Sequence, residues 1–168
     1  MQSKRRSELR RNKVRNDALR EYKFKLYLNA NHFVIFNGQK GESHPHTWEF
    51  AIELLVDKDK FIMFLDFEKA IDDYLEPFQD KLLNDIKPFD TIIPTLENML
   101  DYFAPIFYEE IKKIGGLLIK IEASETPSRT YVYSFRGRDE YLNDLNEHMN
   151  TALSNIVHSI VEESLDEE

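Results

Sequence analysis

Alternating apolar and polar residues predict two β-strands in the first third of the chain. Residues 22–28 are apolar at every second position, and the pattern continues through residues 29–36 before a turn-rich segment at residues 37–41. Residues 44–56 alternate in the same way, and their apolar positions include Trp48, Phe50, Ile52 and Leu54. Because side chains in a strand point to opposite faces in turn, each of these strands has one face suited to a core.

A spacing of three and four between apolar residues predicts two central helices. Residues 67–78 follow this spacing, and Asp66 is the expected N-cap of the first helix. The second helix is expected to follow an N-cap at Thr95 and to end near Gly115, because glycine commonly terminates helices. Two further helices are expected at the ends of the chain, over residues 3–20 and from Asp139 onward.

Two more strands are expected after the central helices, at residues 117–123 and 129–135, with a break at residues 124–128. The resulting order is helix, two strands, two helices, two strands, helix. This order predicts an α+β fold, a four-stranded antiparallel sheet with two helices packed on one face, plus N- and C-terminal helical extensions.

The charge and the periodicity divide the chain into three parts. Residues 1–21 form a basic helical N-terminal extension, residues 22–135 form the α+β domain, and residues 136–168 form an amphipathic C-terminal helix with an acidic end. Residues 1–25 carry ten Lys or Arg against three Asp or Glu, although the whole chain has a net charge of −9. The basic segment can attract the acidic body or a neighbouring subunit. Nucleic-acid binding is the less favoured alternative, because no aromatic residues interleave the basic ones from Lys4 to Arg20.

Cysteine is absent from the 168 residues. Its absence excludes disulfides, thiolate metal ligands and a cysteine nucleophile, and it suits a reducing cytoplasm. No apolar run reaches the roughly 20 residues of a membrane-spanning helix, and no signal-peptide pattern opens the chain. We therefore expect a cytoplasmic protein without a membrane partner.

Three of the five histidines fall within a short window, as His32, His44 and His46. Histidines at alternate positions of a strand point to the same face, and a third from a neighbouring strand can complete a three-histidine metal site. The simpler alternative is that His44 and His46 are surface turn residues and that His32 is a hydrogen-bonded core residue.

Several motifs in order resemble those of the 6-pyruvoyltetrahydropterin synthase / 6-carboxytetrahydropterin synthase family, over about residues 22–135. The motifs are Asn29-Ala30-Asn31-His32-Phe33, His44-Pro45-His46-Thr47-Trp48-Glu49, Phe64-Leu65-Asp66-Phe67, Leu83-Asn84-Asp85 with Pro94-Thr95-Leu96-Glu97-Asn98, and Glu125-Thr126. Pro45 stands where the family usually has glycine. The resemblance implies a T-fold, in which the sheets of several subunits close into a barrel, commonly a hexamer, with active sites between subunits.

The resemblance also implies a cofactor and a substrate. It implies that His32, His44 and His46 bind zinc, which would activate the hydroxyl groups of the substrate as a Lewis acid. The substrate class would be 7,8-dihydroneopterin triphosphate or a related pterin, as in pterin or queuosine biosynthesis. Glu125 would hydrogen-bond the amino and ring N–H groups of the pterin.

Two neighbouring threonines complete the substrate-binding residues that the resemblance implies. Thr126 follows Glu125 in the pterin-anchoring motif. Thr95 would lie at the edge of the pterin, and this role can coexist with its role as a helix cap.

The acid–base residues depart from the pattern of the family. Family synthases use a cysteine shortly before the H-x-H motif as the base, and this chain has none. Glu42 is the candidate replacement, because burial can raise the pKa of a carboxyl group toward neutrality; its alternative is an exposed loop charge. Where the family has an aspartate–histidine pair, the chain has Gln79 and Asp80, so Asp80 is the second catalytic candidate.

These observations leave two main functions open. The first is a zinc-dependent carbon–oxygen lyase with an altered acid–base set, or its side-chain-cleaving variant that would give a hydroxymethyl-dihydropterin. The second is a non-catalytic T-fold binding or assembly protein that keeps the zinc and pterin pocket.

Overall fold

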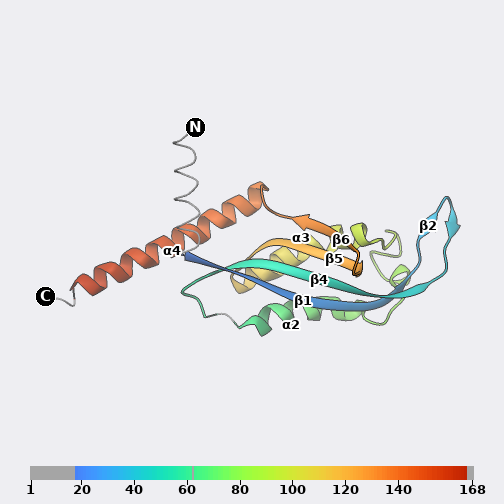
Figure 1. The fold of residues 1–168 in the computed structure, drawn as a ribbon, viewed down its shortest axis with the longest axis horizontal. Helices are drawn as coiled ribbons and strands as arrows, with labels where there is room; N and C mark the ends of the chain where they lie inside the picture. Colours follow the sequence, from blue (N-terminus) through green and yellow to red (C-terminus); the bar gives the residue numbers. More distant parts are fainter. Residues whose placement is uncertain (1–17, 62, 166–168) are drawn as a thin grey trace.

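The computed structural model describes the backbone of residues 18–61 and 63–165, and the side chains of these residues as far as residue 158 (Figure 1). The strands are β1 Leu19–His32, β2 Ile35–Phe36, β3 Gln39–Lys40, β4 His44–Asp57, β5 Gly116–Thr126 and β6 Arg129–Ser134. The helices are α2 Phe64–Leu75, α3 Leu96–Ile114 and α4 Asp139–Leu165, with short 3-10 helices η1 Glu76–Phe78 and η2 Leu83–Asp85. The predicted helix over residues 3–20 lies mostly outside the described residues.

The sheet has the antiparallel order β1-β4-β5-β6. β1 and β4 pair over their whole length, from Leu19 opposite Asp57 to His32 opposite His44. Beyond this long hairpin, β2 and β3 form a small separate hairpin at one end of the molecule (Figure 1). The predicted fold class, an α+β domain with a four-stranded antiparallel sheet, is confirmed.

Aromatic side chains join the sheet to its helices. The ring of Phe50 on β4 lies 6.0 Å from that of Phe103 and 6.1 Å from that of Phe107, both on α3, measured between centroids. Tyr74 of α2 contacts the same two rings. The two helices therefore share one core with the apolar face of the strands, as the alternation of apolar residues predicts.

The ends of α3 follow the prediction. The side chain of Thr95 caps the first turn by accepting a hydrogen bond from the backbone N–H of Asn98 at 3.3 Å. Gly115 ends the helix with φ +91, a left-handed conformation that favours glycine. At Gly116 a Cβ atom would lie 2.8 Å from both Ile111 and Phe67, so the close packing of β5 on the helices also requires glycine.

Two of the predicted helix boundaries are wrong. α2 begins at Phe64 after Met63, so Asp66 lies in the first turn rather than at the N-cap. A carboxylate in that turn still stabilises the helix through the helix dipole. Leu19 and Arg20, predicted as the end of a helix, instead begin β1 and pair with the last residues of β4.

Two strand boundaries also differ from the prediction. β1 ends at His32 and does not continue to Phe36, because the side chain of Asn84 bonds both the N–H and the carbonyl oxygen of Phe33, at 2.9 and 3.1 Å. At the other end, β5 continues to Thr126 through the predicted break, and only the turn between Thr126 and β6 interrupts the hairpin.

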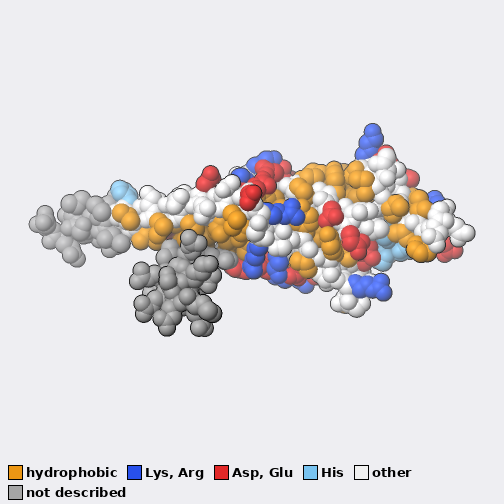
Figure 2. All heavy atoms as spheres, turned by 90° about the horizontal axis from the view of Figure 1, so that it is seen from above, with side chains coloured by type: hydrophobic (Ala, Val, Ile, Leu, Met, Phe, Trp, Pro, Cys, Tyr) orange, Lys and Arg blue, Asp and Glu red, His pale blue; other side chains and the backbone are white. Residues whose placement is uncertain are grey.

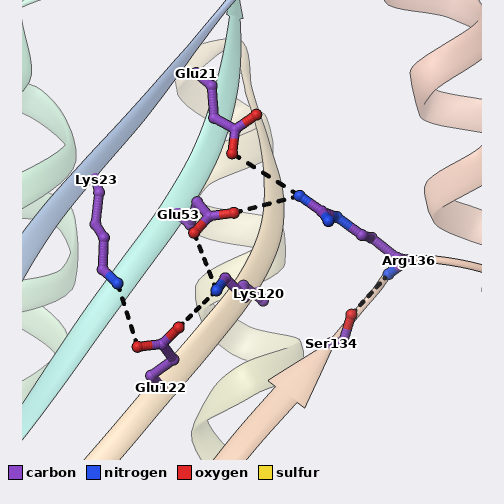
Figure 3. Close-up of polar contacts among 7 residues, drawn as sticks. All are labelled: Glu21, Lys23, Glu53, Lys120, Glu122, Ser134 and Arg136. Carbon is purple, nitrogen blue, oxygen red and sulfur yellow. Dashed lines mark hydrogen bonds and ion pairs between the residues drawn. The ribbon is translucent and has the colours of Figure 1, made fainter. Parts of the chain in front are cut away.

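The sheet face opposite the buried residues carries ion pairs within and between the strands (Figure 3). Lys120 lies 2.6 Å from Glu122 and 3.2 Å from Glu53, while Lys23 pairs with Glu122 and Arg136 with Glu53. Each such pair contributes only up to about 1 kcal/mol. In the view of Figure 2, acidic and basic side chains are likewise intermingled over the described surface.

α4 lies against the end of the sheet and projects beyond it (Figure 1). Asp144 fixes it by accepting hydrogen bonds from the hydroxyl of Tyr108 at 2.7 Å and from Lys112 at 2.9 Å. Burial opposes the ionisation of Asp144, but these two hydrogen bonds outweigh it and hold the pKa of Asp144 below its usual value. Among the described residues, no helix is both long and apolar enough to span a membrane.

Candidate functional site

Three imidazole rings meet where the β1–β4 hairpin ends. His32 is the last residue of β1 and lies directly opposite His44, the first residue of β4. His46 is two positions further along β4, so its side chain points to the same face as that of His44. The three ring centroids lie 4.7 to 5.1 Å apart, and one nitrogen of each ring lies within 4.8 Å of the others.

His32 is held with one ring nitrogen free. Its side chain is buried, at 3% exposure. Nδ1 lies 2.6 Å from the carbonyl oxygen of Pro94, to which a protonated Nδ1 donates. The buried Nε2 atom has no hydrogen-bond partner, and burial lowers the pKa of the imidazole below its usual value. His32 is therefore a neutral tautomer with an unshared electron pair on Nε2.

His44 has a similar arrangement at the exposed side of the cluster. Its Nδ1 lies 3.0 Å from the backbone carbonyl oxygen of Glu42, which again leaves Nε2 as the free nitrogen when Nδ1 carries the proton. Backbone carbonyl groups commonly orient metal-binding histidines in this way. The orphaned buried nitrogen of His32 and the convergence of three rings fit a transition metal, and the described residues can hold one here.

A carboxylate lies beside this cluster. Trp48, two residues after His46, donates its indole N–H to Oε1 of Glu125 on β5 at 3.0 Å. The ring of Trp48 also contacts the rings of His32 and His46, at centroid distances of 5.0 and 5.3 Å. Glu125 lies on the same face as the buried Ala123, at an irregularity in the β5–β6 register between Ser124 and Thr126.

His32, His44 and Glu125 line one open cavity of about 360 Å³. Its lining residues are His32, Val34, His44, Thr95, Leu96, Glu97, Glu125, Arg129, Thr130 and Tyr131. Thr95 therefore both caps α3 and faces the cavity. A cavity of this size and mixed polarity suits a small aromatic molecule with several hydrogen-bonding groups.

Comparison with known proteins agrees with this geometry. The family profile described as 6-pyruvoyl tetrahydropterin synthase matches residues 21–136, which is more than half of the chain. This chain belongs to the 6-pyruvoyl tetrahydropterin synthase family. The resemblance of the motifs is thereby confirmed, and the matched segment contains the histidines and Glu125. No curated protein matches the chain.

Solved structures show the same fold at low sequence identity. The 6-pyruvoyl tetrahydropterin synthase of Caenorhabditis elegans is 17% identical, with a TM-score of 0.55 over 69% of this chain and 95% of that one. A Plasmodium vivax 6-pyruvoyltetrahydropterin synthase, with a catalytic glutamate replaced by alanine, is 15% identical, with a TM-score of 0.53 over 68% and 96%. An uncharacterized Wolinella succinogenes protein is 10% identical, with a TM-score of 0.52 over 70% and 99%.

The predicted acid–base residues of this family member lie apart from the cavity of Glu125. Glu42 is exposed in the segment before β4, and its backbone, rather than its carboxylate, contacts His44. Asp80 is also exposed, and it lines a second hollow of about 330 Å³ together with His46. The histidine cluster therefore lies between the cavity of Glu125 and the hollow of Asp80.

Gln79 and Thr126 have local partners. The side chain of Gln79 accepts a hydrogen bond from the N–H of Asn29 at 2.9 Å and donates one to the carbonyl oxygen of Tyr27 at 2.9 Å. Gln79 thus fixes the edge of β1. Thr126 is exposed, and its hydroxyl lies 3.3 Å from that of Ser128 in the turn. The described residues that line the cavity of Glu125 do not include Thr126.

Sequence reasoning missed several residues of the site. The alternation of residues 44–56 predicts Trp48 as part of the apolar face, and the sequence has no signal for its hydrogen bond to Glu125. Arg129 and Tyr131 line the cavity because β6 follows Glu125 in the same hairpin. The carbonyl group of Pro94, which orients His32, has no side-chain signal at all.

Proposed function

We propose that this family member is a zinc-dependent lyase that acts on 7,8-dihydroneopterin triphosphate or a related pterin. The observation that carries the proposal is the convergence of His32, His44 and His46 beside a cavity that also contains Glu125. The histidines suit the side chain of the pterin, because imidazoles bind a metal that can polarise its hydroxyl groups. Glu125 suits the pterin ring, because a carboxylate accepts hydrogen bonds from N–H groups.

Zinc is the proposed metal because the cluster offers three imidazole ligands and no thiolate. Three histidines leave one coordination position for substrate, which is the usual arrangement of catalytic zinc. When bound, zinc would supply Lewis-acid polarisation of the hydroxyl groups on the pterin side chain. The hydrogen bonds from His32 to Pro94 and from His44 to Glu42 orient the rings toward this role.

Glu125 is the proposed pterin anchor. The indole of Trp48 occupies one side of Oε1, so Oε2 and the remaining electron pair of Oε1 can accept hydrogen bonds from the amino and ring N–H groups of a pterin. Thr95 can donate its hydroxyl proton to the ligand, because its oxygen acts only as an acceptor in the helix cap. Thr126 is a weaker candidate, since its hydroxyl is directed to Ser128.

Glu42 is the proposed base that removes a proton from the substrate. It lies in the segment before His44, where the family uses a cysteine, and the Plasmodium vivax relative has a catalytic glutamate. Asp80 is the proposed second acid–base group, because it shares a hollow with His46. A carboxylate at either position can accept a proton and return it to the product.

The proposed assembly is a cytoplasmic homo-oligomer, a hexamer or another closed T-fold barrel. Among the described residues, β1 and β6 each pair with only one strand of the sheet, so both edges have backbone groups available to a second copy. The ion pairs of the open face, such as Lys120 with Glu53 and Glu122, suit a barrel interior. We propose neither a nucleic-acid nor a membrane partner.

A non-catalytic binding protein is the second candidate. The observation that favours it is the exposure of Glu42 and Asp80 together with the structural use of Gln79, so that neither proposed acid–base carboxylate is buried in the single chain. Such a protein would keep the metal and the pterin but would not turn the pterin over.

Mass spectrometry of the reaction with 7,8-dihydroneopterin triphosphate separates these candidates. The zinc-replete protein should give a pterin product that disappears when a chelator is added, and the mass of the product identifies the bond that breaks. A folded, zinc-loaded protein that gives no product would overturn the lyase and leave the binding function.

A further inference from the structure

Trp48 contacts both halves of the site. Its side chain is fully buried, at 0% exposure, and it lies in β4 opposite Leu28 of β1. On one side it touches His32 and His46, and on the other it donates a hydrogen bond to Glu125. We propose that Trp48 is a positioning residue that couples the metal site to the ligand site, so that each ligand binds more tightly when the other is present. This inference rests on the proposed function.

The contact with Glu125 explains how Trp48 can position the carboxylate. A buried indole N–H requires an acceptor, and Oε1 of Glu125 supplies it at 3.0 Å. The same bond fixes the rotation of the carboxylate and leaves Oε2 for the ligand. Without the indole, the carboxylate would have to be ordered when the ligand binds, at a cost in side-chain entropy.

The contacts with the histidines place Trp48 in position to respond to the metal. The rings of Trp48 and His32 meet edge to face, with an interplanar angle of 85°, and Pro94 holds the other side of His32. A shift of the His32 ring on metal binding would therefore change its contact with the indole. Because the indole of Trp48 is hydrogen-bonded to Glu125, a shift of the His32 ring that moves the indole also changes the preferred position of the carboxylate.

Coupling of this kind is reciprocal. If zinc tightens the binding of a pterin by some factor, the pterin tightens the binding of zinc by the same factor, typically about 5- to 150-fold. Direct contact between zinc and the side-chain hydroxyls would couple the two sites without Trp48, so the coupling is measured with 7,8-dihydropterin, which lacks that side chain. With this ligand, a tryptophan that only fills space would give no coupling. Loss of the coupling when Trp48 is replaced therefore distinguishes a positioning role from ordinary core packing.

The first test measures this coupling directly. The affinity of 7,8-dihydropterin, which has no side-chain hydroxyls to reach the metal, is measured by calorimetry with and without zinc, in the wild-type protein, in Trp48→Phe and in the control Phe50→Leu. Phe50 is a matched control because it is a fully buried aromatic residue of the same strand that packs against α3. Zinc should tighten binding at least about 5-fold in the wild type and in the control, but by less than about 2-fold in Trp48→Phe, with one zinc still bound. Undiminished coupling in Trp48→Phe would overturn the inference.

The second test uses the fluorescence of Trp48, which is the only tryptophan of the chain. Zinc alone should change its emission in the wild type, and Glu125→Gln should change the emission of the metal-free protein. If the emission is the same in Glu125→Gln as in the wild type, the indole–carboxylate contact is wrong. A wild-type protein that binds neither zinc nor 7,8-dihydroneopterin would instead overturn the proposed function, even if the Glu125→Gln result shows the contact.

Discussion

The two groups of predicted site residues differ in how the fold holds them. His32 and Glu125 lie on strands, contact Trp48, and face one cavity. Glu42 and Asp80 lie outside the strands of the main sheet, are exposed, and have no side-chain contact with the histidines among the described residues. The binding residues are thus fixed within one chain, whereas the acid–base residues are not.

The difference follows from strand pairing. One register along the β1–β4 hairpin brings His32 opposite His44 and also determines the position of Trp48. A change of one residue in that register would move the histidines to the other face. No such constraint fixes Glu42, the proposed base in the segment before β4. The proposed acid–base residues can therefore change in the loops while the histidine cluster is retained.

The largest expected effect is on turnover and comes from Glu42. Glu42→Gln removes the proposed base without changing the size of the side chain, so kcat should fall by roughly 10²- to 10⁴-fold. The affinities for zinc and for the pterin should stay unchanged, because the carboxylate of Glu42 contacts neither the histidines nor Glu125. Steady-state kinetics with the mass-spectrometric assay measures this, and normal turnover would assign the base to another residue.

The next effect is on metal binding. His46→Ala removes one of three proposed ligands, and zinc affinity should fall by about 100-fold or more. This loss exceeds the one expected when only a hydrogen-bonding partner that orients a ligand is removed. Competition with a chromogenic chelator gives the affinity. Glu42→Gln is the control that should keep full zinc affinity, and His46→Ala protein with unchanged affinity would exclude His46 as a ligand.

Glu125 should affect the pterin and not the metal. Glu125→Ala removes a charged acceptor, and hydrogen bonds to charged groups contribute about 1.5–3 kcal/mol. The affinity for 7,8-dihydroneopterin should therefore fall by roughly 10- to 100-fold, with one zinc retained. Thr126→Ala is the matched comparison on the next residue. Because Thr126 bonds Ser128, its loss should change affinity by less than about 3-fold, and a loss as large as that of Glu125 would place its hydroxyl on the ligand.

The smallest expected effect on turnover comes from Asp80. Asp80→Asn keeps the backbone conformation, since φ is +58 at this residue and asparagine tolerates the left-handed region. Because Asp80 is exposed to solvent, water can take over its proposed role as the second proton donor. We therefore expect kcat to fall less than about 10-fold. A decrease as large as that of Glu42→Gln would show that assembly brings Asp80 into the reacting centre.

The sequence was sufficient for the parts of the site that depend on periodicity. Alternation placed His44 and His46 on one face of β4, and the apolar spacing with Thr95 located α3. It was not sufficient for contacts between distant segments. The bond from His32 to Pro94 spans 62 positions of the chain, and that from Trp48 to Glu125 spans 77. Such contacts depend on how strands and helices pack, which no local pattern specifies.

The ends of elements were also poorly specified by local patterns. Asp66 has the properties of an N-cap, but α2 begins earlier at Phe64. The apolar residues after His32 suggested a continuous strand, yet Asn84 takes the backbone hydrogen bonds of Phe33. At the end of β1, a tertiary contact determines the boundary.

The measurement that tests the account most directly is X-ray absorption spectroscopy of the zinc-loaded protein. The account predicts one zinc per chain with three imidazole nitrogens at about 2.0–2.1 Å, and a spectrum with only two imidazoles in His46→Ala. A first shell of oxygen atoms without imidazole, or an identical spectrum in His46→Ala, would contradict the three-histidine site.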